Sequence, residues 1–486
     1  MSIRIVLKYL GLVVAIVGAL LLFPLFWSVV VARDGAHFSF IVPMLIAVPG
    51  GLSLFRFIPT EKRSLSRREG LALVTSAWMA GSLVGALPYV LSGTLPGLVD
   101  AYFETMSGFT TTGATVLASI GHQPPSILLW RNFTQWIGGM GIITFFVALF
   151  PILGVGAARL FEAEMPGPQP ERLRTRVSDT ARVLWILYVV LSLLLLALLW
   201  LIGAVPFYDA MNITLSTMPG GGFLHLQGSL GAYADTPFVT TVVTVFMMGT
   251  GVNYALYYFM LRRRRLGVLL ENTEFRVYMG MFIAATGAVT IDLVSRAGMS
   301  MTEALQYASF QVAAIQTTTG YVIADYDLWP TLSKGILLAM MFIGACAGST
   351  AGGLKVVRLI VLTKYAMRQI VVAFSPRTTM PLKVGGAPVS EGLVSAVLGV
   401  AMLHMLCLIG GFLVMSALGL DIVTAFSSVA SAIGNVGPAF AGVGPAKNYA
   451  SIPDAGKILL SGLMLIGRLE FVTVMALISR SFWHWR

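Results

Sequence analysis

The sequence has very little charge and few cysteines or histidines. Only 11% of the 486 residues are Asp, Glu, Lys or Arg, whereas soluble domains carry roughly a quarter, and 57% are hydrophobic. The two cysteines, Cys346 and Cys407, both lie in apolar runs, which excludes a disulfide scaffold and a thiolate metal cluster. The five histidines are scattered, without nucleophile–base or metal-ligand spacing. These absences exclude a water-soluble enzyme.

Acidic residues are scarce too, and the formal net charge is +11. The basic residues are not spread over a polar face, as nucleic-acid binding would require, so no nucleic-acid partner is expected. They form clusters between apolar stretches, and 25 of the 32 fall on one side of the predicted membrane. Because cytoplasmic loops are enriched in Lys and Arg, we expect this side and both termini to be cytoplasmic. The clusters either merely follow this rule or also form a docking surface for a cytoplasmic partner.

The mean hydropathy of +0.84 comes from long apolar stretches. A helix needs about 20 apolar residues to cross a hydrocarbon core about 30 Å thick. Ten stretches qualify, at about 5–32, 36–58, 70–92, 126–158, 181–203, 237–261, 276–297, 333–374, 389–419 and 456–480. The first is too long for a signal peptide and is expected to remain as a membrane helix. The Pro-rich stretch 162–182 is predicted to be a cytoplasmic linker.

Four shorter apolar segments lie between these stretches, at about 100–110, 208–218, 303–316 and 421–433. They are too short to cross and too apolar to be solvated, which is typical of re-entrant segments. Each leads into a glycine-containing loop, and the loop glycines are 98 to 117 residues apart, so a unit of about 100 residues occurs four times. Asp100, Asp209 and Asp421 are predicted N-caps of three segments, with Thr302 and Glu303 in the comparable place of the other. Each half-helix should then direct its partially negative C-terminal end at its loop and favour a cation there.

The four loops have the residues that a filter for a monovalent cation needs. A pore can replace the ion's water with rings of backbone carbonyls, which avoids a costly intramembrane charge. Glycine tolerates the backbone angles that turn successive carbonyls inward. A single loop of this kind is more commonly a turn or a close helix contact, but a fourfold recurrence favours a filter. The predicted filter residues are Thr111, Thr112 and Gly113; Gly220, Gly221 and Gly222; Thr318, Thr319 and Gly320; and Asn435, Val436 and Gly437.

An ordered set of motifs resembles the membrane subunit of Trk-type potassium uptake systems, within the Trk/Ktr/HKT superfamily. The motifs are Phe103–Thr115, Trp130–Gly141, Thr317–Tyr321, Gly348–Lys355 and Gly434–Pro438, and the resemblance covers essentially the whole chain. It implies four M1-pore-M2 units around one pseudo-fourfold pore, with potassium bound in the filter and at no other metal site. It also implies a homodimer and a cytoplasmic ring of TrkA-like nucleotide-binding regulatory subunits. No cofactor is expected in this chain, and a nucleotide is expected only on the regulatory partner.

The second loop departs from the family pattern. It reads Met218-Pro-Gly-Gly-Gly-Phe-Leu-His225, where a residue such as Ile usually precedes the glycine pair and Ser follows Phe. Pro219 has no backbone donor and a fixed φ, so this quarter is expected to be stiffer or differently hydrated. The departure leaves open whether the filter selects potassium alone or passes sodium as well. Sodium transport in the HKT branch often accompanies serine at the first-loop glycine, so Gly113 favours potassium.

The stretch 333–374 is interrupted by a segment rich in glycine and small polar residues, which is a poor helix former. Irregular backbone at membrane depth is tolerated only where protein covers it or where it lines water. By resemblance, this segment is the intramembrane loop that blocks the pore below the filter; the alternative is a simple packing kink. The predicted gate residues are Gly344, Gly348, Ser349, Thr350, Gly352, Gly353 and Lys355.

Arg468 lies inside the last apolar stretch, where a charge is costly and by default functional. Glu470 is two residues away and faces elsewhere on a helix, which argues against a local ion pair. In the family this arginine lies near the pore under the filter, where its charge can hold the loop and raise the barrier to cations. The alternative is a pair with an acid of another helix, such as Glu104.

The sequence therefore predicts an all-α polytopic membrane protein with two N-terminal helices and four pseudo-fourfold M1-pore helix-M2 repeats around one pore. The predicted divisions are 1–69 for the N-terminal pair and a basic loop, then 70–180, 181–275, 276–388 with the broken M2, and 389–486. The predicted function is potassium-selective uptake across the bacterial inner membrane, gated by the intramembrane loop and a cytoplasmic subunit. Two alternatives stay open: a sodium-coupled or mixed potassium/sodium transporter of this superfamily, and an unrelated secondary solute transporter. Channel-like and proton- or sodium-coupled movement are not distinguished.

Overall fold

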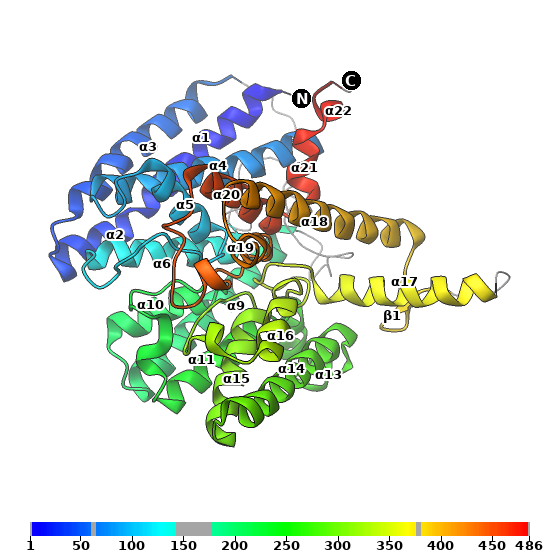
Figure 1. The fold of residues 1–486 in the computed structure, drawn as a ribbon. Helices are drawn as coiled ribbons and strands as arrows, with labels where there is room; N and C mark the ends of the chain where they lie inside the picture. Colours follow the sequence, from blue (N-terminus) through cyan, green and yellow to red (C-terminus); the bar gives the residue numbers. More distant parts are fainter. Residues whose placement is uncertain (1, 60–64, 142–176, 376–380, 485–486) are drawn as a thin grey trace.

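Helices dominate the computed structural model, which describes residues 2–59, 65–141, 177–375 and 381–484 (Figure 1). Within these ranges six helical segments are long and apolar enough to cross a membrane, and a bent pair adds up to one more. The six are Ile3–Ala32, His37–Phe57, Arg68–Leu91, Arg182–Ile202, Thr273–Ala297 and Glu391–Ala417. The prediction of a polytopic helical membrane protein is confirmed.

Two antiparallel helices form the N-terminal unit. The first runs through α1 (Ile3–Leu20), α2 (Leu22–Phe26) and the π-helical turn η1 (Trp27–Ala32), and the chain returns as α3 (His37–Phe57). A Cβ added at Gly51 would overlap the carbonyl oxygen of Gly11, so the two backbones touch at this crossing. Small residues permit such tight packing in a membrane, where lipid is as apolar as the side chains. The unit packs against α4 (Arg67–Leu91).

Four units follow, each with a first helix, a short helix, a loop and a second helix. The first unit contains α4, α5 (Leu98–Phe109) and α6 (Pro125–Gly139). The second contains α9 (Val177–Ala197) with η2 (Leu198–Ile202), α10 (Phe207–Thr217), η3 (Ser229–Tyr233), α11 (Pro237–Thr250), α12 (Tyr254–Arg263) and α13 (Gly267–Glu271). The third contains α14 (Thr273–Ala297), α15 (Met301–Gln316), η4 (Tyr326–Leu328), α16 (Thr331–Met341) and α17 (Val356–Phe374). The fourth contains α18 (Glu391–Ala417), α19 (Ile422–Gly434), η5 (Ala441–Val443), α20 (Asp454–Arg468), α21 (Val472–Ile478) and α22 (Arg480–His484).

In the second and fourth units the second helix is not the straight span that the sequence predicted, whereas the break in the third unit lies where the sequence predicted one. In the second unit, α11 and α12 meet at an angle of 94°, because the chain leaves the helix at 251–253. In the third, the chain is interrupted between α16 and α17, and in the fourth between α20 and α21. The last break contains two consecutive residues with a positive φ, Glu470 and Phe471, at 56° and 57°. In the first unit, α6 ends at Gly139, and residues 142–158 of the predicted stretch, with 162–176 of the predicted linker, lie outside the described residues, while 177–182 of that linker already belong to α9.

The short helices do not all begin with an acidic cap. The prediction holds for Asp421, whose side chain accepts from two backbone N–H groups at the start of α19, and these hydrogen bonds lower its pKa. It is wrong for Asp100 and Asp209, which lie in the first turns of α5 and α10. In α15 the cap is Ser300, with Glu303 in the first turn. Every short helix thus has an acid near its start, where the helix dipole favours negative charge.

The chain ends and the α17–α18 pair mark the outline of the molecule. In Figure 1, α1 begins and α22 ends at the same edge of the view, and α17 extends away from the remaining helices, while α18 packs against α19 and α20. The N–H of Ser2 donates to Glu69 at the start of α4, and α21 packs against α4 too. Between α17 and α18, β1 (Lys383–Val384) and β2 (Ala387–Pro388) form a small antiparallel ribbon.

Candidate functional site

The four predicted filter loops share one backbone conformation. The first residue of each loop has a positive φ: 54° at Thr111, 69° at Gly220, 57° at Thr318 and 54° at Asn435. The third residue is left-handed again: 83° at Gly113, 80° at Gly222, 70° at Gly320 and 99° at Gly437. For a β-branched residue such as threonine this conformation is an outlier, so the surrounding structure must impose it. Four segments far apart in the sequence have therefore been folded to the same unusual local shape.

Each loop is tied back to the end of its own short helix. In three loops the N–H of the middle residue donates to a helix carbonyl: Thr112 to Ser107 at 2.8 Å, Gly221 to Ser216 at 2.9 Å, and Val436 to Ser431 at 2.9 Å. In the third loop the N–H of Gly320 donates to Ala314 at 2.9 Å. The loops thus continue directly from the helix C-termini, where the helix dipole places partial negative charge.

The glycine in the third position lets each loop approach the next one. A Cβ added at Gly113 would overlap the carbonyl oxygen of Gly221 in the second loop. The same relation joins Gly222 to Thr319, Gly320 to Val436, and Gly437 back to Thr112. The contacts therefore close a ring, and the middle carbonyls of all four loops belong to it. All twelve predicted filter residues are brought together here.

Side-chain hydrogen bonds hold three of the loops from within their own units. Thr110 and Thr112 share a hydrogen bond of 2.8 Å, as do Thr317 and Thr319, while the Gly437 carbonyl accepts from Ser431 Oγ at 2.8 Å and Tyr449 Oη at 2.7 Å. The second loop has glycine at all three filter positions. Its carbonyl oxygen at Gly221 accepts instead from Gln135 of α6, in the first unit.

A buried ion pair holds the chain just beyond the first and second loops. Arg131 Nε lies 2.6 Å from Glu104 Oε1, and the two side chains are 2% and 0% exposed. Glu104 also accepts from the Val116 N–H after the first loop, and Arg131 donates to the Leu224 carbonyl after the second. These extra hydrogen bonds satisfy the desolvated charges. Because Glu104 is engaged in this way, the alternative that it pairs with Arg468 is wrong.

The predicted gate segment leaves the third-unit helix and returns to it at nearly the same point. Ile343 and Leu354 form an isolated bridge, and the N–H of Gly344 donates to the carbonyl of Leu354 at 2.9 Å. Gly353 packs against Gly344 at this base. The chain from Gly344 to Leu354 is thus a closed excursion between two helices, rather than a kink within one.

The tip of this excursion lies against the ring of filter loops. The N–H of Gly352 donates to Thr318 Oγ1 at 2.8 Å, and a Cβ at Gly352 would overlap Asn435. Thr350 Oγ1 lies 3.4 Å from the Met218 carbonyl oxygen, at the start of the second loop. The gate segment therefore touches three of the four quarters directly.

Arg468 joins the remaining quarter to the same segment. Its guanidinium donates to Thr111 Oγ1 at 3.1 Å and to the Thr350 carbonyl at 2.6 Å. It also donates to the carbonyls of Gly138 and Gly139, at 2.8 and 2.9 Å, at the end of α6. The side chain is half-buried at the end of α20, so a positive charge lies beside the ring and the gate segment at once.

The other predicted gate residues have local partners. The carbonyl of Gly348 accepts from the N–H of Tyr254 at 3.1 Å, which attaches the excursion to the start of α12. Ser349 Oγ donates to the Cys346 carbonyl inside the excursion. Lys355 is 3% exposed and donates to the Ala351 carbonyl. Among the described residues, neither Ser349 nor Lys355 forms a hydrogen bond with the filter loops.

Sequence reasoning missed several side chains that hold the site. Glu274 Oε1 accepts from the N–H groups of Ala347 and Val357, at 2.8 and 3.0 Å, and so ties the gate excursion to α14. Glu470 pairs with Arg358 at the start of α17. The available signal was the presence of these polar residues in or beside apolar stretches. Their partners lie far away in sequence, so the signal could not assign them a role.

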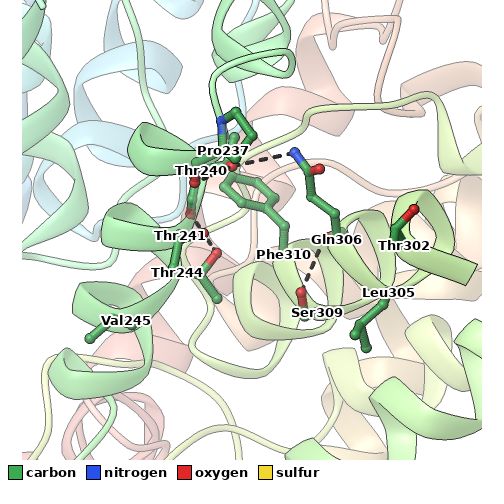
Figure 2. Close-up of a pocket in the computed structure, with 10 residues that line it drawn as sticks. All are labelled: Pro237, Thr240, Thr241, Thr244, Val245, Thr302, Leu305, Gln306, Ser309 and Phe310. Carbon is green, nitrogen blue, oxygen red and sulfur yellow. Dashed lines mark hydrogen bonds between the residues drawn. The ribbon is translucent and has the colours of Figure 1, made fainter. Parts of the chain in front are cut away.

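A pocket of about 330 Å³ lies away from the ring, between α11 and α15. In Figure 2, Gln306 of α15 reaches toward Thr240 of α11, and it also donates to the Ala234 carbonyl at 2.9 Å. Thr244 and Ser309 donate to carbonyls of their own helices, so these hydroxyls are engaged. The polar groups here join the third short helix to the second unit.

Comparison with known proteins gives consistent matches over the full length. A family described as TrkH, cation transport protein, matches residues 39–484. The Trk system potassium uptake protein TrkH of Salmonella typhimurium is 37% identical over 488 residues, and that of Escherichia coli K12 is 36% identical over 492, each with 100% of both chains covered. The crystal structure of the potassium transporter TrkH from Vibrio parahaemolyticus superposes with a TM-score of 0.89 at 31% identity, covering 100% of both chains.

Proposed function

Because this chain belongs to the TrkH family of cation transport proteins, which are not enzymes, we propose that it takes up potassium through one pore lined by the four filter loops. The observation that carries the proposal is the closed ring in which each loop's glycine contacts the next loop's middle carbonyl. Backbone carbonyls held in this way replace the hydration shell of a monovalent cation without introducing a fixed negative charge. The names of the relatives, all potassium uptake proteins, support potassium as the ion.

Selectivity for potassium over sodium follows from how firmly the ring is held. The two strained threonines, the alternating left-handed residues and the hydrogen bonds to the short helices all restrain the carbonyls. Gly113 stands where sodium transporters of the HKT branch often have serine. A held ring resists collapse around the smaller sodium ion, which therefore loses more hydration energy than it regains.

The gate is the excursion from Gly344 to Leu354, held under the ring by Arg468. Its contacts with Thr318 and Asn435 at the filter loops support this role. The Arg468 guanidinium adds a fixed positive charge there, and a cation approaching it meets repulsion that low dielectric strengthens. Opening requires the excursion to leave the ring, which breaks the hydrogen bond of Arg468 to the Thr350 carbonyl and that of the Gly352 N–H to Thr318.

The wider assembly follows the family and the positions of the basic residues. We expect the protein in the bacterial inner membrane, with both termini cytoplasmic, as a homodimer above a TrkA-like ring of regulatory subunits. The nucleotide belongs to those subunits, and this chain has no cofactor of its own. Motion of the regulatory subunits would enter at the cytoplasmic ends of α12 and α17 and reach the gate at the starts of these helices. Tyr254 at the start of α12 contacts the excursion, and α17 begins directly after it.

The test is ion flux into liposomes that contain the purified protein. Potassium, rubidium and sodium uptake are measured separately, with and without an imposed proton gradient. We expect potassium and rubidium flux well above sodium flux, and no absolute need for the gradient. Equal sodium and potassium flux would contradict the selective filter and favour a mixed transporter. Uptake that occurs only with a proton gradient would contradict a simple pore.

A further inference from the structure

The second filter loop lacks the side-chain hydrogen bonds from its own unit that hold the other three loops. Its residues Gly220, Gly221 and Gly222 have no side chains, so the loop cannot form a side-chain hydrogen bond of its own. A run of glycines also has the largest backbone freedom of any sequence. Yet this loop has the same left-handed residues as the others. Something outside the loop must therefore supply the restraint.

Gln135 of α6 occupies the required position. Its side chain is fully buried, and Nε2 donates to the Gly221 carbonyl oxygen at 2.5 Å. Oε1 accepts from Ser216 Oγ at 2.8 Å and from the Phe223 N–H at 3.1 Å. These two donors determine which end of the amide is oxygen, so the nitrogen must face the Gly221 carbonyl. Gln135 thus joins the short helix before the loop, the loop itself and the residue after it.

Gln135 and Gly221 also fit each other in space. A Cβ added at Gly221 would overlap the Gln135 amide, whereas the other loops have Thr112, Thr319 and Val436 at the equivalent position. One turn further along α6, a Cβ at Gly139 would overlap Pro219. The end of α6 therefore cradles the second loop, and glycine at 221 makes room for the amide.

The contact has a direct consequence for the ring. The Gly221 carbonyl is the one that touches Gly113, so it belongs to the ring of middle carbonyls. Among the described residues, the Gly221 carbonyl is the one of the four middle carbonyls that accepts a hydrogen bond from a side chain. An amide donor fixes the direction of the carbonyl and engages part of its capacity as an acceptor.

We propose that Gln135 is a specificity-determining positioning residue, which holds the Gly221 carbonyl at the spacing that suits dehydrated potassium rather than sodium. The inference rests on the proposed function, because it needs the ring to be the filter. Without the amide, the glycine loop can move its carbonyl toward a smaller ion, and discrimination against sodium falls. Gln135 acts through the carbonyl and does not contact the ion.

The test compares two substitutions that separate the two ends of the amide. Gln135→Glu keeps an oxygen that accepts from Ser216 and Phe223 but has no donor for Gly221, whereas Gln135→Leu removes both. We expect the sodium-to-potassium flux ratio in liposomes to rise about fivefold in both variants, as the loss of one net hydrogen bond implies. A flux ratio reports only on active molecules, so a lower yield of folded protein does not change it.

Gln316 provides the matched control. It too is a fully buried glutamine close to a filter loop, two residues before Thr318, but its Nε2 donates to the Tyr278 carbonyl and not to a filter carbonyl. Gln316→Glu and Gln316→Leu should leave the flux ratio at the wild-type value. An unchanged ratio in both Gln135 variants, with a selective wild type, would overturn the inference alone. An unselective wild type would overturn the proposed function instead.

A paired substitution tests the spatial fit. Gly221 is not among the left-handed residues, so alanine is limited there by the Gln135 amide and not by its own backbone. Gly221→Ala should reduce potassium flux about tenfold, and Gln135→Ala in the same chain should restore part of that flux by removing the overlap. Additive losses in the double variant would show that the two residues do not share the space, and would count against the inference.

Discussion

The second and third filter loops have the same backbone path but are held by different means. Thr317 and Thr319 restrain the third loop with a hydrogen bond between their own side chains, and Thr318 accepts from the gate excursion. The second loop depends on Gln135, which belongs to another unit. The fourfold geometry is thus fixed by backbone conformation and by the third-position glycine, whereas the side-chain restraints differ: the first and third loops share a threonine pair, and the second and fourth do not.

The same contrast extends to the gate. The first loop is linked to it through the guanidinium of Arg468, and the third through the hydroxyl of Thr318. The second loop offers only the Met218 carbonyl, 3.4 Å from Thr350 Oγ1. Displacing the excursion should therefore disturb the first and third quarters more than the second. Four quarters of similar shape need not respond equally when the pore opens.

Substitution of the third-position glycine that all four filter loops share should reduce potassium uptake the most. Gly222→Ala and Gly320→Ala each place a Cβ on a neighbouring carbonyl at a positive φ, which by itself costs about 1–2 kcal/mol. We expect potassium uptake to fall at least about tenfold in both variants. Uptake is measured in cells that depend on this protein for potassium. Gly335→Ala, in open space on α16, serves as the control, and near-normal uptake in either filter variant would break the claim of a common backbone.

Arg468→Ala should have the next largest effect, in the opposite direction. The change removes donors to Thr111 and Thr350 and also a positive charge beside the ring. Charge-assisted hydrogen bonds are worth about 1.5–3 kcal/mol, so basal potassium flux in liposomes without a regulatory subunit should rise about tenfold. Arg296→Ala, which alters a largely exposed arginine, should leave the flux unchanged. Unaltered basal flux in Arg468→Ala would exclude the role of this residue in the gate.

Loss of the threonine hydroxyl pairs in the first and third loops should change transport less, and by different amounts in the two loops. Thr112 Oγ1 bonds to Thr110 and also accepts from Asn435 Nδ2 at 3.0 Å, whereas Thr319 has the bond to Thr317. Thr112→Val leaves a buried donor poorly satisfied, so we expect the sodium-to-potassium ratio to rise about threefold, against about twofold for Thr319→Val. The same liposome assay measures both. Equal ratios would mean that the Asn435 contact contributes nothing to selectivity.

The smallest change in the sodium-to-potassium flux ratio is expected for a substitution beside the fourth filter loop. Tyr449→Phe removes one of two donors to the Gly437 carbonyl, and Ser431 remains. Because the second donor keeps the carbonyl in place, the flux ratio should change by less than about twofold. A larger change would show that duplicate donors do not protect a loop, and would weaken the contrast with the single donor at Gly221.

Much of the architecture could be predicted from the chain alone. Long apolar stretches predict membrane helices because a hydrocarbon core demands them, and the short segments before glycine loops predict half-helices. The glycines 113, 222, 320 and 437 could also be identified from the sequence, because a left-handed residue that touches the neighbouring loop is best provided by glycine. The acid caps were a partial error, because Asp100 and Asp209 lie in the first turn and not at the cap.

The particular contacts of the site could not be read from the chain. Nothing near Glu104 in the sequence indicates that Arg131 is its partner, and nothing near Gln135 indicates the Gly221 carbonyl, 86 residues away. Such contacts depend on how helices of different units cross, which local propensity and periodicity do not specify. The breaks in α11–α12 and α20–α21 were missed because hydropathy records composition and not direction.

The sequence by itself determined that the chain is a helical membrane protein with four similar units, because water, lipid and glycine backbone angles act on residues locally. Only the tertiary structure decided which side chains hold which carbonyl. The second loop shows the reason: with no side chains of its own, its restraint comes from Gln135 in another unit, and that contact exists only after the units have packed.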